Sequence, residues 1–350
     1  MRAGAASSAR LVVTLAAGAA AVGLAYRLDP NDIPIYMNMG LAALVAIGLS
    51  LLMGFAGQIS LGQGAFYALG AYTAAILTVG LDPDERLIDP EAGIAPWAAV
   101  LVAPLLTALV AAVVGVPLLR LRGHYLAFAT LALHLILIAA LFAEDRFTGG
   151  QDPGLIIAKP LEVAGFMMGG VGDAARNLAA VIWGLVALAL LVGVNLVRSR
   201  AGRALRAIAT SEAAAAATGI NVAAYKLRLF VLAAGLAGLA GGLFAFRLGF
   251  LSPDAFPVII SIEFVVIVVV GGLGSVYGAV LGAIAIVWLQ DRLQQLGSRE
   301  QLLGFDLPVQ APGVFRIGVF ALILIVVMLF LPRGVLPALG DGVRRLRRLR

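Results

Sequence analysis

The sequence predicts an all-α polytopic membrane protein with about ten membrane segments, some of them interrupted helices, and with both termini in the cytoplasm. Three observations indicate this fold class. The 350 residues are 62% hydrophobic and only 13% charged, whereas soluble domains are about 25% charged, so the chain has too few charges to cover itself with a hydrated surface. Apolar runs of membrane-spanning length recur along the chain. Lys and Arg residues gather in alternate connections between these runs.

A helix needs roughly 20 apolar residues to cross about 30 Å of hydrocarbon. Runs that approach this length lie at residues 11–26, 36–55, 61–81, 96–119, 125–143, 178–197, 229–246 and 314–331. The first run follows Arg2 and Arg10 and has the length of a signal peptide, so a cleaved leader is an alternative to a retained first segment.

A further apolar run, at 258–290, is longer than one span requires and contains four residues, 271–274, of which three are glycine. We interpret it as two segments that meet at these glycines. The positive-inside rule places the arginine-rich tail in the cytoplasm, and an N-terminus on the same side requires an even number of segments. The split gives ten. The predicted inner connections and the tail then hold most of the Lys and Arg residues and only two acids, Glu212 and Asp341.

The composition also excludes several classes of site. The chain has no cysteine and two histidines, which excludes thiolate chemistry and argues against a histidine-built metal site. Its two lysines, Lys159 and Lys226, follow Ala and Tyr, so there is no Gly-Lys pair for a phosphate-binding loop. We therefore expect no catalytic residue, metal or cofactor in this chain, and any ATP must bind to another chain. The positive net charge reflects membrane topology rather than nucleic-acid binding.

Two apolar runs are separated by a polar, glycine-rich break at residues 54–64. Backbone that leaves the helix at membrane depth must be buried in protein or line a wet path, because lipid cannot satisfy its hydrogen bonds. The break brings glutamine and serine side chains into this region. Local packing is the alternative, but we favour a translocation pathway formed by Gly57, Gln58, Ser60, Gly62 and Gln63.

Glu263 is the one acid inside a predicted segment, close to its outer end. An acid at membrane depth is costly and is a candidate for the pathway. Two structural alternatives remain open, because the side chain could reach the interface or pair with Arg247 on the preceding segment. We expect His134 to be a buried hydrogen-bonding residue rather than a proton relay.

Glycines recur every four residues in two other segments and would place bare backbone along one helix face. We expect these positions to allow close helix packing: Gly238 and Gly242 in one segment, and Gly274, Gly278 and Gly282 in the other.

The longest predicted inner loop, 198–228, begins with a basic stretch and contains a sharply bounded helix signal. Thr210 or Ser211 would cap the helix, Glu212 suits its positive end, five alanines propagate it, and Gly219 would stop it. Because a helix this short does not persist alone in water, it must pack on this chain, on lipid headgroups or on a partner protein. These alternatives are not separated by the residues themselves.

Four stretches together resemble bacterial ABC importer permeases, and more narrowly the branched-chain amino acid permeases of the LivM type. They are the loop and following segment at 198–242 (with GRALRAI, EAA, TGIN and YKL), the break and following segment at 54–72, residues 119–131 with 148–150, and residues 252–282. Any one stretch is a weak signal, whereas the set covers most of the chain beyond residue 35.

The resemblance implies a translocation subunit that pairs with a second, related permease, two cytoplasmic ABC ATPases that bind ATP and Mg, and an extracytoplasmic substrate-binding protein, in the bacterial inner membrane. The short helix then matches the family's coupling helix, which sits in a groove of the ATPase. The implied coupling residues are Arg203, Arg206, Glu212, Ala213, Ala214 and Gly219. The sequence departs from the general importer motif in two ways. The motif places its glycine four residues after the last alanine, whereas here the distance is five residues, and the motif's Ile-x-Leu-Pro ending is absent.

We expect three parts: an N-terminal membrane segment with a short outer loop at 1–35, the permease domain at 36–332, and a basic cytoplasmic tail at 333–350. The expected cargo is a branched-chain or related hydrophobic amino acid. Urea, short amides and aromatic acids are alternative cargoes, because related permeases share these motifs. An ion-coupled secondary transporter is a further alternative, although Glu263 is the one carboxylate that suits it, and a channel would leave the short helix unexplained.

Overall fold

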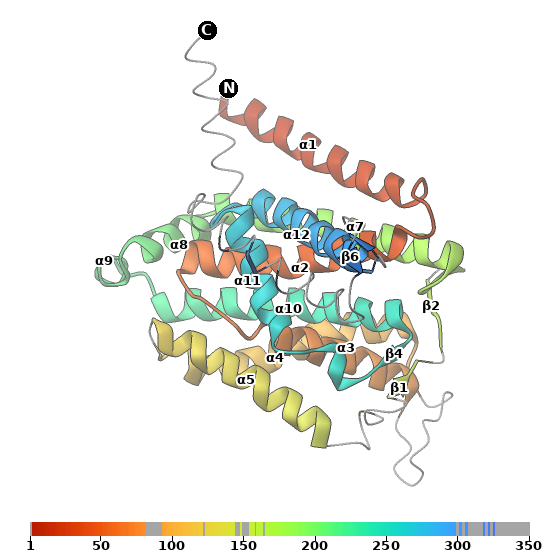
Figure 1. Cartoon of the computed structure of the whole chain (residues 1–350). Helices are drawn as coiled ribbons and strands as arrows, with labels where there is room; N and C mark the ends of the chain where they lie inside the picture. Colours follow the sequence, from red (N-terminus) through yellow and green to blue (C-terminus); the bar gives the residue numbers. More distant parts are fainter. Residues whose placement is uncertain are drawn as a thin grey trace.

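Figure 1 shows the computed structural model of the chain, which describes residues 2–80, 93–121, 123–143, 148, 154–157, 159–163, 165–298, 301–302, 305–306, 318, 321–322 and 325. In these residues long helices run back and forth through one bundle. They are α1 (Arg2–Ala25), α2 (Ile33–Ala56), α3 (Gln63–Val79), α4 (Pro96–Leu118), α5 (His124–Ala143), α7 (Gly172–Arg198), α10 (Val222–Leu248), α11 (Ile259–Gly271) and α12 (Val276–Gly297).

The all-helical, multi-span architecture is confirmed. Within the described residues, seven helices have the length and apolar composition to cross a membrane: α2, α4, α5, α7, α10, α11 with the turn before it, and α12. The expected helix interruptions are also present, because α2 ends before Gly57 and α11 ends before Gly272. The expected segment at 314–331 lies almost entirely outside the described residues, so the count of ten stays a prediction.

Helix α2 forms the centre of the bundle. It is apolar on every side, as a fully buried helix must be, and nearly all of its residues are buried. It packs against α7, α10, α11 and α12, and Gly48 allows the backbone of α10 to approach closely, since a Cβ there would lie 2.9 Å from the Cα of Ala233. The bundle therefore surrounds the helix that leads into the polar break.

The connections gather at two opposite ends of the bundle. At one end, on the left in Figure 1, lie α8 (Arg200–Thr210), α9 (Glu212–Ala217) and the start of α5; we call this the α9 end. The opposite end, called the strand end, carries short antiparallel pairs, β1 (Leu155–Ile156) with β4 (Phe250–Leu251) and β2 (Leu161–Val163) with β3 (Phe166–Met168). A third pair joins β5 (Gln301–Leu302) to β6 (Phe305–Asp306). None of these strands is predicted from the sequence.

The glycine positions allow helices to pack closely. A Cβ at Gly238 would lie 2.6 Å from the Cβ of Thr107 in α4, and one at Gly242 would lie 3.3 Å from the Cβ of Ala103. Gly278 and Gly282 face the backbone of α11, so α11 and α12 form a tight antiparallel hairpin. The expectation that Gly274 shares their helix face is wrong, because α12 begins only at Val276 and Gly274 lies in the preceding turn with φ +79°.

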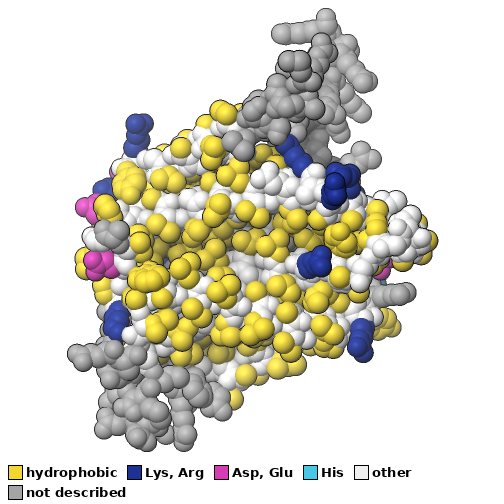
Figure 2. All heavy atoms as spheres, turned by 180° about the vertical axis from the view of Figure 1, so that it is seen from behind, with side chains coloured by type: hydrophobic (Ala, Val, Ile, Leu, Met, Phe, Trp, Pro, Cys, Tyr) yellow, Lys and Arg dark blue, Asp and Glu magenta, His cyan; other side chains and the backbone are white. Residues whose placement is uncertain are grey.

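The first helix belongs to this bundle. Helix α1 packs along α7, where a Cβ at Gly18 would lie 2.6 Å from the Cβ of Ala187. The Tyr36 hydroxyl donates a hydrogen bond to the carbonyl oxygen of Ala21 at 2.6 Å, and the hydroxyls of Thr14 and Tyr277 lie 2.9 Å apart. Figure 2 shows a wide band of hydrophobic side chains across the back of the molecule, as expected for a surface that faces lipid.

Candidate functional site

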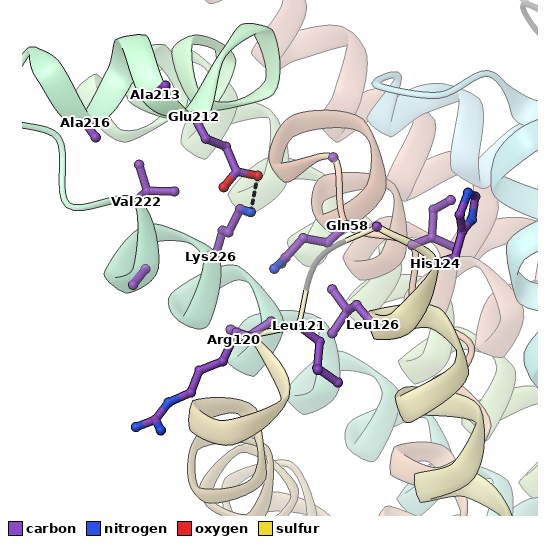
Figure 3. Close-up of a pocket in the computed structure, with 15 residues that line it drawn as sticks. Gln58, Arg120, Leu121, His124, Leu126, Glu212, Ala213, Ala216, Val222 and Lys226 are labelled. Carbon is purple, nitrogen blue, oxygen red and sulfur yellow. Dashed lines mark hydrogen bonds and ion pairs between the residues drawn. The ribbon is translucent and has the colours of Figure 1, made fainter.

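A hollow of about 770 Å³ opens at the α9 end of the bundle (Figure 3). Three parts of the chain form it: the connection between α2 and α3, the connection between α4 and α5, and the segment from α9 into the first turn of α10. Its volume lies within the range of roughly 300–1,000 Å³ that is common for ligand sites. Of the site residues predicted from the sequence, it brings together Gly57, Gln58, Glu212 and Ala213.

The polar break begins at the C-terminal end of α2. Gly57 adopts a left-handed conformation with φ +64°, which favours glycine, and its N–H donates to the carbonyl oxygen of Leu52. The N–H of Gln58 reaches the same carbonyl at 3.3 Å. This cap stops the helix, so that residues 58–62 cross the α9 end and lead into α3.

Side chains from other helices satisfy the backbone of the break. The N–H of Leu61 donates to Oγ1 of Thr130 in α5 at 3.0 Å, and the N–H of Gly64 donates to Oγ of Ser261 in α11 at 2.9 Å. Ser60 is buried, and its Oγ accepts from the N–H of Gly62 at 3.4 Å. The break is thus held inside the protein, which removes the cost of unsatisfied peptide groups at membrane depth.

His134 joins this arrangement to α11. Its Nδ1 lies 2.8 Å from Oγ of Ser261, and its Nε2 lies 3.2 Å from the carbonyl oxygen of Phe256. Because a carbonyl can only accept, Nε2 carries the proton and Nδ1 accepts from the Ser261 hydroxyl. The prediction that His134 is a buried hydrogen-bonding residue is confirmed.

Two glutamines of the break are buried with unpaired amide atoms. Gln58 is 3% exposed, and its Oε1 has no hydrogen-bond partner. Gln63, at 0% exposure, has no partner for either amide atom. Figure 3 shows the side chain of Gln58 extending into the hollow toward Lys226, whereas Gln63 does not line it. An unsatisfied buried amide costs free energy, so both groups are candidates for contact with a transient ligand.

Helix α9 is capped at both ends. Of the two candidate caps, Ser211 is the one used, since its hydroxyl accepts from the N–H of Ala214 at 3.2 Å. At the other end Gly219, with φ +83°, donates to the carbonyl oxygen of Ala216, and Ile220 donates to that of Ala215. This pair of bonds is the Schellman arrangement, which requires the left-handed glycine. Ala215 is buried, whereas Ala213 and Ala214 are exposed.

An ion pair joins α9 to α10. Nζ of Lys226, in the first turns of α10, contacts Oε1 of Glu212, the first residue of α9. The Lys226 side chain is 13% exposed and the Glu212 side chain 49% exposed. Both residues line the hollow, and the dashed line in Figure 3 marks their contact. The pair therefore links the short helix to a helix that packs against α2, α3 and α4.

The basic stretch before α9 forms α8, with its apolar face on the bundle. Leu205 and Ile208 are buried, while Arg203 and Arg206 are exposed on the other face. The guanidinium of Arg206 donates to the carbonyl oxygen of Val197 at 2.9 Å. Arg203 and Arg206 do not line the hollow.

The remaining predicted pathway residues lie elsewhere. Ser60 and Gly62 belong to the break but not to the hollow, and a Cβ at Gly62 would lie 2.8 Å from the carbonyl oxygen of Thr130. Glu263 lies in α11, is half-buried, and does not line the hollow. Among the described residues, no group of three or more His, Asp or Glu side chains is arranged as a metal site.

Three residues that the sequence analysis did not propose take part in the site: Lys226, Thr130 and Ser261. Thr130 and His134 are four residues apart in α5 and, with Leu126, form its buried face. That spacing is visible in the sequence and could have indicated a polar stripe facing the protein. The partners of Lys226 and Ser261 depend on tertiary packing and left no local signal.

A family model described as "Branched-chain amino acid transport system / permease component" matches residues 33–331. The chain is 30% identical over 335 residues to the high-affinity branched-chain amino acid transport system permease protein LivM of Salmonella typhimurium, covering 91% of this chain and 72% of that protein. It is 32% identical to LivM of Escherichia coli, over 87% and 68% of the two chains. LivH of Salmonella typhimurium is 27% identical, over 84% and 90%. No solved structure matches.

Proposed function

Because this chain belongs to the family of branched-chain amino acid transport permease components, we propose that it is the transmembrane permease subunit of an ABC importer for branched-chain or related hydrophobic amino acids. One structural observation carries the proposal further than the family alone. A short helix, capped at both ends and exposed on one side, stands at the basic end of an apolar bundle and is ion-paired to a core helix.

The proposed assembly contains this chain, a second related permease, two cytoplasmic ATPases that bind ATP and Mg, and an extracytoplasmic binding protein. Two kinds of permease protein, LivM and LivH, occur among the relatives, which supports pairing of unlike permeases. The absence of a Gly-Lys pair from the sequence supports ATP binding by other chains.

We place the α9 end in the cytoplasm of a cell with this protein in its inner membrane. The described charged side chains at that end are mostly cations, as the positive-inside rule requires of a cytoplasmic face. They are Arg120, Arg198, Arg200, Arg203, Arg206, Lys226 and Arg228, with Glu212 as the acid among them. The middle of α1 passes the start of α12, where Thr14 meets Tyr277, so the N-terminal half of α1 points toward the α9 end, and this supports a cytoplasmic N-terminus.

The division of the chain follows from the same topology. The family match at 33–331 supports a permease domain at 36–332, with α1 as an added N-terminal membrane segment within 1–35. The contacts of α1 with α7 and α12 support its retention in the working protein. The basic tail at 333–350 lies outside the described residues, and we assign it to the cytoplasm from its arginines.

We assign α9 as the coupling helix that docks on an ATPase. Its exposed face is made of small residues, Ala213 and Ala214, which permit close approach of a partner surface. Arg203 and Arg206 extend this surface onto α8, and Gly219 fixes where α9 ends. When ATP closes the two ATPases, the movement of α9 passes through the Glu212–Lys226 pair to α10 and changes the balance between outward-facing and inward-facing packing.

We assign the cargo pathway to the side of this chain that carries the break. The unpaired amides of Gln58 and Gln63 would bind the polar ends of an amino acid as it passes, and Ser60 keeps the intervening backbone in place. Gly57 and Gly62 allow the chain to turn there without side-chain obstruction. Glu263 stays a proposed pathway residue at the strand-end side of α11.

The test is ATP-driven uptake of radiolabelled leucine by the complete assembly in proteoliposomes. Ala214→Trp places a bulky group on the exposed face of α9 and should abolish uptake and cargo-stimulated ATP hydrolysis. Ala209→Trp, at an exposed position of α8, is the matched control. Uptake by this subunit alone on a proton or sodium gradient would overturn the proposal.

A further inference from the structure

We propose that the hollow at the α9 end binds a free zwitterionic amino acid with an apolar side chain from the cytoplasmic side, as a product site at the inner end of the proposed pathway. The inference rests on the proposed function for the orientation of the α9 end and for the class of amino acid. It goes beyond that function by assigning a ligand to a place where α9, α10 and the break meet.

The hollow offers opposite charges beside each other. Lys226 carries three N–H donors, and its contact with Oε1 of Glu212 uses one of them. The other donors are available to a ligand carboxylate without loss of the ion pair. The Glu212 carboxylate accepts several hydrogen bonds and can receive one from a ligand ammonium group.

Gln58 supplies the second, independent observation. Its Oε1 is buried and has no hydrogen-bond partner, and the side chain points into the hollow beside Lys226 (Figure 3). A buried amide oxygen without a donor is rare in native structures. Figure 3 draws the amide nitrogen at the tip of this side chain, and a half-turn of the amide would turn Oε1 toward an ammonium group bound beside Glu212, which would provide the missing donor.

The rest of the wall is suited to an aliphatic side chain. Ile59, Leu121, Leu126, Val222 and Ala216 line the hollow around these polar groups. Arg120 also lines the hollow, but its guanidinium extends away from the Glu212–Lys226 pair (Figure 3). A zwitterion leaves the net charge of that pair unchanged, whereas a ligand with one charge would unbalance it. The site therefore favours an apolar amino acid over the corresponding amine or carboxylic acid.

Occupancy of this site has a consequence for transport. The ligand contacts α9, α10 and the break at once, so it holds together three parts that must move when α9 moves. A ligand that binds one of two packings more tightly shifts the equilibrium toward it. Accumulated product inside the cell should therefore slow its own import.

The experiment uses the complete assembly and a single introduced thiol, because this chain has no cysteine. Ala216→Cys places the thiol in the hollow, and Ala217→Cys places it on the neighbouring exposed residue of α9, outside the hollow. L-leucine should slow maleimide labelling of this subunit at A216C at least fivefold and leave labelling at A217C unchanged. Leucinamide and 4-methylpentanoate, which each lack one charge, should protect neither position.

The two lysines provide matched variants. Lys226→Met, combined with A216C, should remove the protection, whereas Lys159→Met should keep it, because Lys159 lies at the strand end and donates to the carbonyl oxygen of Gly93. Normal leucine uptake by the A216C assembly without protection of the thiol, or equal protection at A217C, overturns this inference and leaves the proposed function standing. Loss of ATP-driven uptake in the unmodified assembly overturns the proposed function itself.

Discussion

Gly54, near the end of α2, lies directly against Gly274 in the turn between α11 and α12. A Cβ at Gly54 would overlap the backbone nitrogen and Cα of Gly274. The two interruptions, which are more than 200 residues apart in the sequence, thus come together at the α9 end. Each turn limits the space that the other can occupy.

Gly54→Ala should therefore destabilise the protein. The added methyl group meets backbone rather than a flexible side chain, and overpacking of this kind costs typically 1–3 kcal/mol. Thermal unfolding in detergent measures the change. Gly184→Ala in α7 is the control, because nothing lies within 4 Å of a Cβ there, and its Tm should stay the same or rise slightly.

The Glu212–Lys226 pair predicts a non-additive double-mutant cycle. Glu212→Gln and Lys226→Met should each reduce cargo-stimulated ATP hydrolysis. The rate of the double variant should be no lower than that of the less active single variant. The pair's contribution to stability should stay within about 1 kcal/mol, because Glu212 is half exposed and solvent screens the attraction. Strictly additive losses of ATP hydrolysis would show that the two residues act separately.

Gly219→Ala should loosen α9 without disturbing the bundle. A left-handed conformation costs an L-residue roughly 1–2 kcal/mol, so the amide hydrogens of 214–220 should exchange at least about fivefold faster. Gly219→Asn should show a smaller effect, because Asn tolerates this conformation better. Equal exchange rates in the parent and Gly219→Ala proteins would contradict the cap assignment.

Ser261→Ala should destabilise the contact between α3, α5 and α11. It removes the acceptor of the Gly64 N–H and the donor to Nδ1 of His134, and each buried group left unpaired costs about 1–3 kcal/mol. The Tm should fall by several degrees. Thr73→Val is the control, since the Thr73 hydroxyl bonds to Leu69 within its own helix and its loss leaves no other group unpaired. A Tm loss as small as that of the control would refute the role of Ser261.

Gln58→Leu should separate uptake from ATP hydrolysis. The substitution replaces the unpaired amide by an apolar side chain of similar size, so folding should be preserved. If Gln58 contacts the cargo, leucine uptake falls while basal ATP hydrolysis stays near the parent level. Full uptake would contradict the role of Gln58 in the pathway.

Much of the helix layout was predictable, since apolar runs bounded by charges and glycines locate spans through their length. The predicted run 229–246 nevertheless falls short of α10, which begins at Val222. Its first turns carry Lys226 and Arg228, so they lack the apolar signal, and the helix is started instead by Asn221, whose side chain accepts from the N–H of Ala224.

The site was predictable only where its signals are local. Ser211, Glu212 and Gly219 act on neighbouring residues, and their roles in α9 follow from backbone capping. The pairing of Glu212 with Lys226 depends on the path of the chain between the two helices, and the hydrogen bond of Ser261 to Gly64 spans 197 residues. Neither contact has a sequence signature.

Helix α5 is attached to the bundle in an unusual way for so apolar a segment. Only 17% of the residues in its most apolar stretch are buried, the smallest share among the described candidate spans. In a bilayer, lipid tails compete equally with neighbouring aliphatic side chains, so the hydrophobic effect does not hold a helix to its neighbours. The hydroxyl of Thr130 and the imidazole of His134 are then the chief tethers of α5. Among the described spans, α5 therefore has the fewest contacts to break if it moves away from the bundle into the surrounding lipid.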